Sequence, residues 1–489
     1  MGRSITLKYQ VLGGIGWVSL SQFLRYLFQF AFIAILARLL SVDDFGIMAI
    51  VMAFTALSLS IGDLGLSAAI VQNKNLKQNA LSSALWVCAL AGSALFVIMI
   101  KVAPVISHFF HKEIINSVIT VFSLKFIIDS FGIVADSLLR KELLFRKVAV
   151  IEICETLSFG LISIGLAFNG WRVWSLVYGY IFSSLLRVCL LWIIYPWRPN
   201  LSLSLNSLNE LIRFAKNMFS YKVTNYLISN IDRIIIGRSL GSLTLGYYSM
   251  AYNISNFARE KISGIVNKVA FPAFSKIQED KEQLMRAYLK IIKYASIIIF
   301  PLLCGLILLC PEFVRFAFSE KWNAMVVPLQ YLCIAGMISS ITTFVGLIFL
   351  ASGHAEIEFH LSIISLFALI STIVITSRLG ITAVAIGICV YSLLINIIAY
   401  IFVRRLVRID LISYVNALLP AIIYSAVMLI VLKLFLLLVK INFSLPDVFL
   451  LISSAILGMS IYLAGLYISN VQIFREIIDI FCNKYEQNI

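Results

Sequence analysis

Charged residues are scarce in this chain of 489 residues, and their scarcity excludes most soluble folds. Only 13% of the residues are charged, whereas 61% are hydrophobic. A soluble domain cannot bury that much apolar surface. The apolar runs extend from one end of the chain to the other, with short loops between them. We therefore expect an integral membrane protein with no soluble catalytic domain.

Motifs for metal, disulfide and nucleotide chemistry are also missing. The eight cysteines lie singly in apolar runs without a C-x-x-C pair, so neither a zinc site nor a disulfide framework is indicated. His108 and His111 stand apart from other ligand types. No G-x-x-x-x-G-K-[ST] or H-E-x-x-H sequence occurs. We expect no cofactor, no metal and no enzyme activity, and no ATP-driven pumping by this chain alone.

The formal net charge of +15 does not indicate nucleic-acid binding, because the basic residues fall mainly in short loops. With the N-terminus inside, the cytoplasmic loops hold roughly twice as many Lys and Arg residues as the opposite loops. This bias predicts that both termini are cytoplasmic. The first apolar segment, residues 11–36, lacks an A-x-A cleavage site and is predicted to remain as a spanning helix.

The apolar runs predict an all-α integral membrane protein with about fourteen transmembrane helices, since about 20 residues cross the hydrocarbon core. Among them are predicted spans at 12–36, 211–236 and 245–270. Six helices form a predicted N-lobe at 1–200 and six a C-lobe at 201–407. Residues 408–489 would add two accessory helices and a cytoplasmic tail.

An internal repeat supports the two lobes. Four residues recur at a spacing of two hundred positions, namely Ile35, Arg38, Leu40 and Gly46 as Ile235, Arg238, Leu240 and Gly246. Glycines also bracket the approach to the sixth and twelfth spans, at Gly170 and Gly179 and at Gly380 and Gly387. An even number of spans per repeat predicts a parallel pseudo-repeat about an axis along the membrane normal.

Polar faces in the first, seventh and eighth spans are candidate cavity linings. Arg25 lies near the middle of the first span with Gln22 and Gln29 on its helical face. A charge inside the bilayer is costly and marks a functional site by default. Arg25 either contacts an anion in a central cavity or pairs with an acidic residue. The later spans contribute Lys222, Asn225, Asn253, Asn256 and Arg259.

Four acidic residues in the predicted spans are candidates for coupling transport to a proton or sodium ion: Asp63, Asp129, Asp136 and Glu152. A carboxylate in a low-dielectric environment holds a proton more readily. Lys125 lies four residues before Asp129, and the two could neutralise each other on one helix. Asp136 is predicted to have no such local partner. Arg187 either faces the cavity or pairs with one of these acids.

Four segments carry a resemblance to a known family: ILARLLSVDDFGIMAIVMAF (35–54), GDLGLSAAIVQNKNL (62–76), NYLISNIDRIIIGRSLGSLTLGYYSMAYNI (225–254) and VAFPAFSKIQED (269–280). The third contains N-x-D-x-x-x-I-G-R followed by LG-x-Y. In these segments the chain resembles the Wzx-type polysaccharide flippases of the MOP (multidrug/oligosaccharidyl-lipid/polysaccharide) exporter superfamily. The resemblance covers roughly residues 1–410, and the last two helices diverge most.

This resemblance implies a V-shaped pair of six-helix lobes around a cationic cavity in a bacterial inner membrane. It implies that an undecaprenyl-pyrophosphate-linked oligosaccharide is the substrate, with polysaccharide polymerase machinery as a further partner. Arg25, Lys222 and Arg259 would then suit the pyrophosphate. Gln22, Gln29, Asn225, Asn253 and Asn256 would suit the glycan.

Two alternatives remain open at this point. A drug/cation antiporter of the same superfamily would need acidic and aromatic cavity residues, whereas the middle of the polar helices is net basic. A membrane-embedded glycan polymerase or ligase would need a substantial outer loop for its chemistry, and this chain has none.

Overall fold

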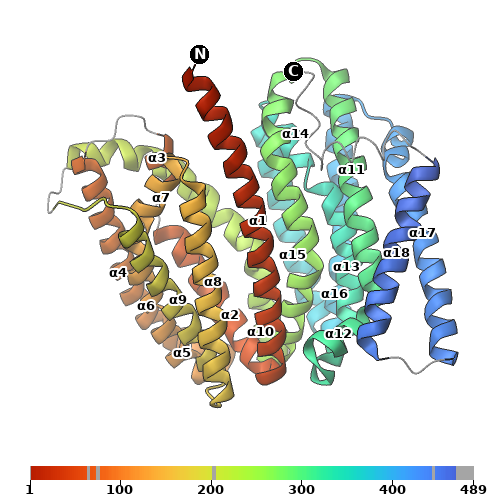
Figure 1. The fold of residues 1–489 in the computed structure, drawn as a ribbon, viewed down its shortest axis with the longest axis horizontal. Coiled ribbons are helices and arrows are strands. Elements are labelled where there is room, and N and C mark those ends of the chain that lie inside the picture. Colours follow the sequence, from red (N-terminus) through yellow and green to blue (C-terminus); the bar gives the residue numbers. More distant parts are fainter. Residues whose placement is uncertain (1, 63–65, 73–77, 201–204, 443–445, 470–489) are drawn as a thin grey trace. The chain divides into compact units, whose positions relative to one another are not determined.

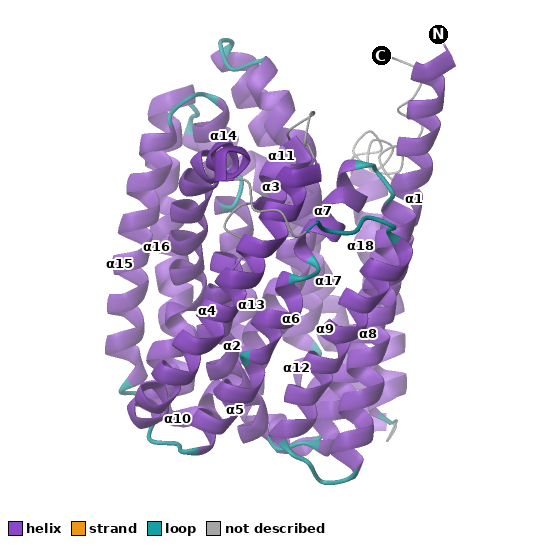
Figure 2. Ribbon diagram, turned by 90° about the vertical axis from the view of Figure 1, so that its left-hand side faces the viewer, coloured by secondary structure: helices purple, strands orange, loops and turns teal. Residues whose placement is uncertain are grey.

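A computed structural model describes residues 2–62, 66–72, 78–200, 205–442 and 446–469. Only the backbone is described for residues 2–20, 56–62, 68, 205–225, 227–228, 265, 268–269, 355 and 469. Across these ranges the regular structure is helical and contains no strand, as Figures 1 and 2 show. The predicted all-α class is confirmed.

The helices follow one another with short connections. In chain order they are α1 Gly2–Leu39, α2 Val42–Gly62, α3 Leu66–Gln72, α4 Gln78–Phe110, α5 Ile114–Phe122, α6 Leu124–Ser130, α7 Ile133–Lys141, α8 Phe145–Phe168, α9 Val173–Ile194, α10 Leu205–Lys276, α11 Lys281–Leu308, α12 Cys310–Phe318, a 3-10 turn Glu320–Met325, α13 Val326–Thr342, α14 Val345–Ala351, α15 Ala355–Ser377, α16 Ile381–Val407, α17 Leu411–Asn442 and α18 Asp447–Ser469.

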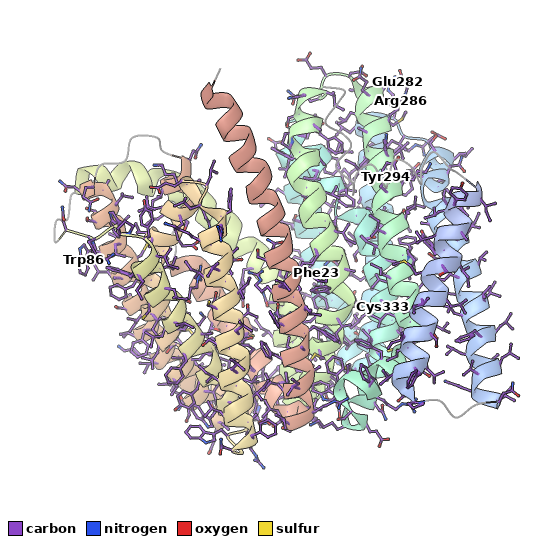
Figure 3. The ribbon with its side chains drawn as sticks, in the orientation of Figure 1. Phe23, Trp86, Glu282, Arg286, Tyr294 and Cys333 are labelled. Atoms are coloured by element: carbon purple, nitrogen blue, oxygen red, sulfur yellow. The ribbon has the colours of Figure 1, made fainter. Side chains whose placement is uncertain are left out.

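Ten of the described helices are long and apolar enough to cross a membrane, and an eleventh span forms if the bent pair Ile114–Ser130 and Ile133–Lys141 counts as one. The predicted total of fourteen is not confirmed. Large apolar side chains are exposed on these helices: Phe23, labelled in Figure 3, is 64% exposed, and Leu161 and Ile430 are 66% and 61% exposed. So much exposed apolar surface suits contact with lipid rather than water. The protein is a multi-pass integral membrane protein.

The chain divides into two compact units, Met1–Gly246 and Tyr247–Ile489. In unit 1, α8 packs on α1 and α9, α4 packs on α5 and α6, and α3 packs on α7. In unit 2, α13 packs on α11 and α16, α15 on α16, and α17 on α11 and α18. These contact-based units end within α10, whereas the predicted lobes follow the sequence repeat; the lobe boundaries stay a prediction.

The two spans predicted at 211–236 and 245–270 lie in α10, which is interrupted at Gly241. Its backbone there has φ 81° and ψ 170°, a conformation essentially restricted to glycine. The helical ladder is broken at this one residue, and α10 therefore consists of two arms. The break falls in the segment between the two predicted spans.

The glycines of the second sequence echo have matching structural roles. Gly170 (φ 77°) and Gly380 (φ 98°) both adopt left-handed backbone conformations, just before α9 and α16. A Cβ on Gly179 would lie 1.9 Å from Ser163 Oγ of α8, and one on Gly387 would lie 2.7 Å from Thr376 Cγ2 of α15. Glycine at both positions therefore permits the close packing of α8 on α9 and of α15 on α16.

The last two helices are tied to unit 2 at several points. Tyr462 of α18 donates a hydrogen bond to the Ile297 carbonyl of α11 (2.8 Å). Lys440 Nζ lies 2.6 Å from Glu312 Oε1, whose residue is only 2% exposed. Arg315 Nη2 lies 3.2 Å from Asp447 Oδ1. These contacts join α12 to both α17 and α18.

Candidate functional site

A chain of alternating charges runs through unit 1 and begins at Arg25 of α1. Arg25 Nη1 donates to Glu152 Oε2 of α8 at 2.9 Å, and Arg140 Nη2 of α7 donates to the other oxygen, Oε1, at 3.1 Å. Arg140 Nε also donates to Asp136 Oδ2, one helical turn earlier, at 2.8 Å. Glu152 therefore bridges two arginines from different helices.

The chain of charges continues at Arg187 of α9. Its Nη2 lies 3.5 Å from Asp136 Oδ1, and its Nε lies 3.7 Å from Glu155 Oε2. The second distance is too long for a hydrogen bond. Arg187 Nε is buried and has no hydrogen-bond partner among the described residues. Arg187 is thus bound through electrostatic attraction, and its Nε–H has no hydrogen-bond acceptor among the described residues.

A second cluster lies beside this chain. Lys125 Nζ of α6 lies 2.8 Å from Asp129 Oδ2 and donates to Ser184 Oγ of α9 at 3.0 Å. Ser184 in turn donates to Asp129. Lys125 and Asp129 are only 13% and 17% exposed, so the pair lies largely inside the helical packing.

The two groups together are charge-neutral. Arg25, Lys125, Arg140 and Arg187 supply four positive charges, and Asp129, Asp136, Glu152 and Glu155 supply four negative charges. Ionised groups in a low-dielectric interior are stable only when they are compensated in this way. An additional anion would need one of the carboxylates to be protonated or displaced.

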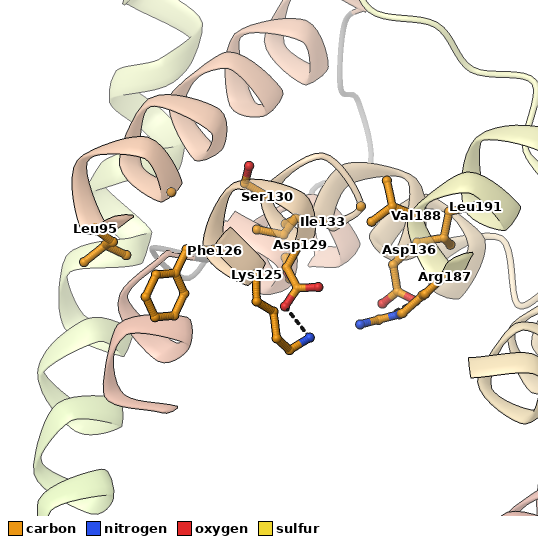
Figure 4. Close-up of a pocket in the computed structure, with 13 residues that line it drawn as sticks. Leu95, Lys125, Phe126, Asp129, Ser130, Ile133, Asp136, Arg187, Val188 and Leu191 are labelled. Atoms are coloured by element: carbon orange, nitrogen blue, oxygen red, sulfur yellow. Dashed lines mark ion pairs between the residues drawn. The ribbon is translucent and has the colours of Figure 1, made fainter. Parts of the chain in front are cut away.

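A cavity of about 340 Å³ opens beside these charges (Figure 4). Lys125, Asp129, Asp136 and Arg187 line it, and the two ion pairs stand next to one another in the close-up. Leu95, Phe126, Ile133, Val188 and Leu191 form the apolar wall. Its volume suits a phosphate group, ions with water or a single sugar ring, but not a whole oligosaccharide.

Unit 2 contains a different kind of polar group. Arg259 Nε donates to Asn256 Oδ1 at 2.8 Å, and its Nη1 lies 3.4 Å from the Oγ1 of Thr343, the residue directly after α13. Within the described residues no carboxylate pairs with Arg259. Asn396 Nδ2 of α16 donates to the Oγ1 of Thr342, the last residue of α13, at 3.0 Å. In the part of the chain whose side chains are described, Arg259 is therefore bound by neutral polar groups, whereas Arg25 is bound by a carboxylate.

Comparison with known proteins assigns this fold. The sequence profile of a family described as polysaccharide biosynthesis protein matches residues 35–327, well over half of the chain. The chain belongs to this family. The match includes Asp129, Asp136, Arg140, Glu152 and Arg259, whereas Arg25 lies before its start.

One relative and two solved structures support the family. The chain is 28% identical over 397 residues to the lipopolysaccharide biosynthesis protein WzxC of Escherichia coli strain K12, covering 81% of this chain and 80% of that protein. The lipid II flippase MurJ in an inward closed conformation aligns with a TM-score of 0.75 and 16% identity over 94% of this chain and 99% of its own. An inward-facing multidrug resistance MATE family transporter of the MOP superfamily aligns at 0.65 and 16% identity over 81% and 98%.

At 16% identity the two structures establish the fold alone, but the family match and the relative carry the sequence relation. The predicted resemblance to Wzx-type proteins of the MOP superfamily is confirmed. This protein is a membrane protein of polysaccharide biosynthesis.

The predicted site residues of this family member meet with different outcomes. Asp129, Asp136, Glu152 and Arg25 lie in the charged groups of unit 1. Gln22 is partly buried and Gln29 exposed on α1, while in unit 2 Asn256 is buried beside Arg259 and Asn253 is exposed. Asp63 and the side chains of Lys222 and Asn225 lie outside the described residues.

The prediction that Asp136 lacks a local partner is wrong. Arg140 lies four residues further along α7, where the helical turn brings the two side chains together. The sequence spacing alone allows this pair, because the two residues are four apart. Arg187 was expected either to face a cavity or to pair with one of the acids; it lies against Asp136 and also lines the cavity. Its contact with Glu155 of α8 could not be predicted, because the two residues lie on different helices and no local spacing connects them.

Proposed function

We propose that this protein moves an undecaprenyl-pyrophosphate-linked oligosaccharide repeat unit from the inner to the outer leaflet of the bacterial inner membrane. The observation that carries the proposal is a charge-lined cavity inside an apolar helical unit whose fold matches a lipid II flippase. A lipid-facing carrier with a charge-lined cavity of this size can shelter the phosphate-bearing part of a hydrophilic headgroup while the lipid tail stays in the bilayer.

The polar residues divide the headgroup between them in this proposal. Arg25, Arg259 and Lys222 contact the pyrophosphate, because guanidinium and ammonium groups bind phosphate oxygens through charge-assisted hydrogen bonds. Gln22, Gln29, Asn225, Asn253 and Asn256 contact the glycan. Arg259, which has no carboxylate partner in the described part of the chain, is available to an anion without breaking an ion pair.

Charge balance supports coupling to an ion gradient. Arg25 is already paired with Glu152, so a pyrophosphate that binds Arg25 displaces that carboxylate. A displaced carboxylate in a low-dielectric site needs a proton or a sodium ion. Glu152, Asp129, Asp136 and Asp63 are the acids proposed for this coupling, and the protein would act by alternating access of its two lobes, with both termini in the cytoplasm.

A complementation experiment tests the proposal. A strain that lacks the protein should accumulate lipid-linked repeats and lose surface polysaccharide, and the wild-type chain should restore it. Arg25→Ala, Lys222→Ala and Arg259→Ala should each fail to restore polysaccharide at equal membrane abundance, whereas Arg25→Lys should restore part of it because a positive charge remains.

Arg286→Ala serves as the matched control. Arg286 pairs with Glu282 on the exposed start of α11 and is 72% exposed, so its removal should leave export unchanged (Figure 3). Normal polysaccharide with all three alanine variants would contradict the proposed headgroup site. Export of single repeats that fail to lengthen would instead indicate a polymerase.

A further inference from the structure

Two glycines separated by two hundred residues make a reciprocal contact inside unit 1. A Cβ added to Gly46 would lie 1.7 Å from the Ser242 carbonyl oxygen. A Cβ added to Gly246 would lie 2.2 Å from the Val42 carbonyl oxygen. Each glycine therefore touches the residue that lies four positions before its counterpart. We call these four residues the glycine contact.

The glycine contact has the form of a two-fold interface. In such an interface residue i touches residue j, and the counterpart of i touches the counterpart of j. The two sides of this contact are the starts of the two sequence repeats. The residues that recur between 35–46 and 235–246 therefore belong to two matching surfaces that contact each other. Neither glycine has a positive φ, so close approach and not backbone conformation requires glycine here.

A polar tie lies over the glycine contact. Lys112 Nζ, in the turn between α4 and α5, lies 2.5 Å from Asp43 Oδ2 and donates to Ser242 Oγ at 2.7 Å. Ser242 Oγ donates to Asp43 Oδ1 at 2.5 Å. The start of α2 is thereby joined to the second arm of α10 directly after its break at Gly241.

The polar contacts of the tie are weak enough to break. Lys112 and Asp43 are 31% and 35% exposed, and partly exposed ion pairs contribute little to stability. Both residues also line a cavity of about 410 Å³ with Arg172, Trp171 and Trp174, which gives the separated charges access to water. At Gly46 and Gly246 the closest contacts are with backbone atoms, because glycine has no side chain.

We propose that the glycine contact and its Asp43–Lys112–Ser242 tie form a latch between the two repeats that must open and close once in each transport cycle. The proposal rests on the proposed function, since a carrier with a single fixed arrangement needs no latch. The matched positions in the two repeats let both sides separate and meet again as equal surfaces.

A reversible cross-link tests the latch. In Asp43→Cys/Ser242→Cys, oxidation with copper phenanthroline should join the two starts of the repeats, because the parent side chains are in hydrogen-bond contact. Export of newly made surface polysaccharide should continue under reducing conditions, because the glycine contact is kept and the partly exposed tie contributes little stability. It should stop on oxidation and return with dithiothreitol. Reduced cells thus verify the proposed function separately from the latch.

Ser339→Cys/Ser392→Cys is the matched control pair. These hydroxyls are 3.2 Å apart between α13 and α16 within unit 2, so their cross-link should leave export unchanged. Undiminished export by a fully cross-linked Asp43–Ser242 pair, verified by mass spectrometry, would overturn the latch.

A second pair of variants keeps the test independent of cysteine chemistry. Gly46→Ala and Gly246→Ala should each lower export to a similar extent at normal abundance, since either methyl group wedges the same contact apart. Gly305→Ala is the control, because nothing lies within 4 Å of a Cβ at that position. Normal export by both contact variants would also contradict the latch.

Discussion

At the scale of single residues, the compensation of buried charge dominates this protein. Every cation in the charged groups of unit 1 has an acidic neighbour, and the acids are shared between arginines from different helices. Glu152, which bridges Arg25 and Arg140, shows why the function of one residue depends on the others. Moving any one charge obliges another to find a new partner.

The Lys125–Asp129 pair gives a direct test of this compensation. Lys125→Met should destabilise the detergent-solubilised protein toward the lower end of the about 3–5 kcal/mol typical of breaking a buried pair, because Asp129 keeps an uncompensated charge. Asp129→Asn should cost a similar amount. The double variant Lys125→Met/Asp129→Asn should lose less than the sum of the two single losses, measured by thermal unfolding. Additive losses would show that the two charges do not compensate each other.

Some of these pairs could be predicted and others could not. Lys125 and Asp129 lie one helical turn apart, and the sequence spacing predicted their pairing, which the structure confirms. Arg25 and Glu152 are separated by 127 residues, so only the packing of α1 on α8 brings them together. A single sequence identifies which residues need a partner, but it does not identify a distant partner.

At the scale of elements, Gly241 divides α10 into two arms. Gly241 alone in this helix has a backbone conformation that other residues strongly disfavour, and Ser242 directly after it reaches Asp43. The sequence predicted two spans on either side of this position from hydropathy. The two arms of α10 correspond to these spans. The sequence did not predict the glycine conformation that separates them, because hydropathy carries no information on backbone angles.

Gly241→Ala should therefore destabilise the protein by about 1–3 kcal/mol, the usual cost of holding a non-glycine residue in such a backbone region. A Cβ at Gly241 would meet nothing within 4 Å, so the loss would come from the backbone alone. Gly264→Ala, also in α10 and equally free of contacts, should be neutral or slightly stabilising. Thermal unfolding of both variants provides the measurement, and equal stability of the two would contradict this account of the break.

At the scale of the whole molecule, composition was sufficient to predict the all-α membrane class, and a resemblance in four segments predicted the family. The number of spans was less well determined: ten described helices, or eleven with the bent pair, meet the criterion, against fourteen predicted. The difference arises partly from α10, whose two arms combine polar positions with apolar ones, since a hydropathy criterion penalises polar faces.

The measurement that tests the central claim most directly is the leaflet in which lipid-linked repeats reside. Intact spheroplasts can be treated with a membrane-impermeant periodate and hydrazide label that reacts with exposed sugars, and the labelled lipid-linked repeats are then quantified. The account predicts labelled repeats in cells with the wild-type protein and protected repeats in the deletion strain and with Arg25→Ala. Equal labelling in the deletion strain would contradict the claim that this protein carries them across the membrane.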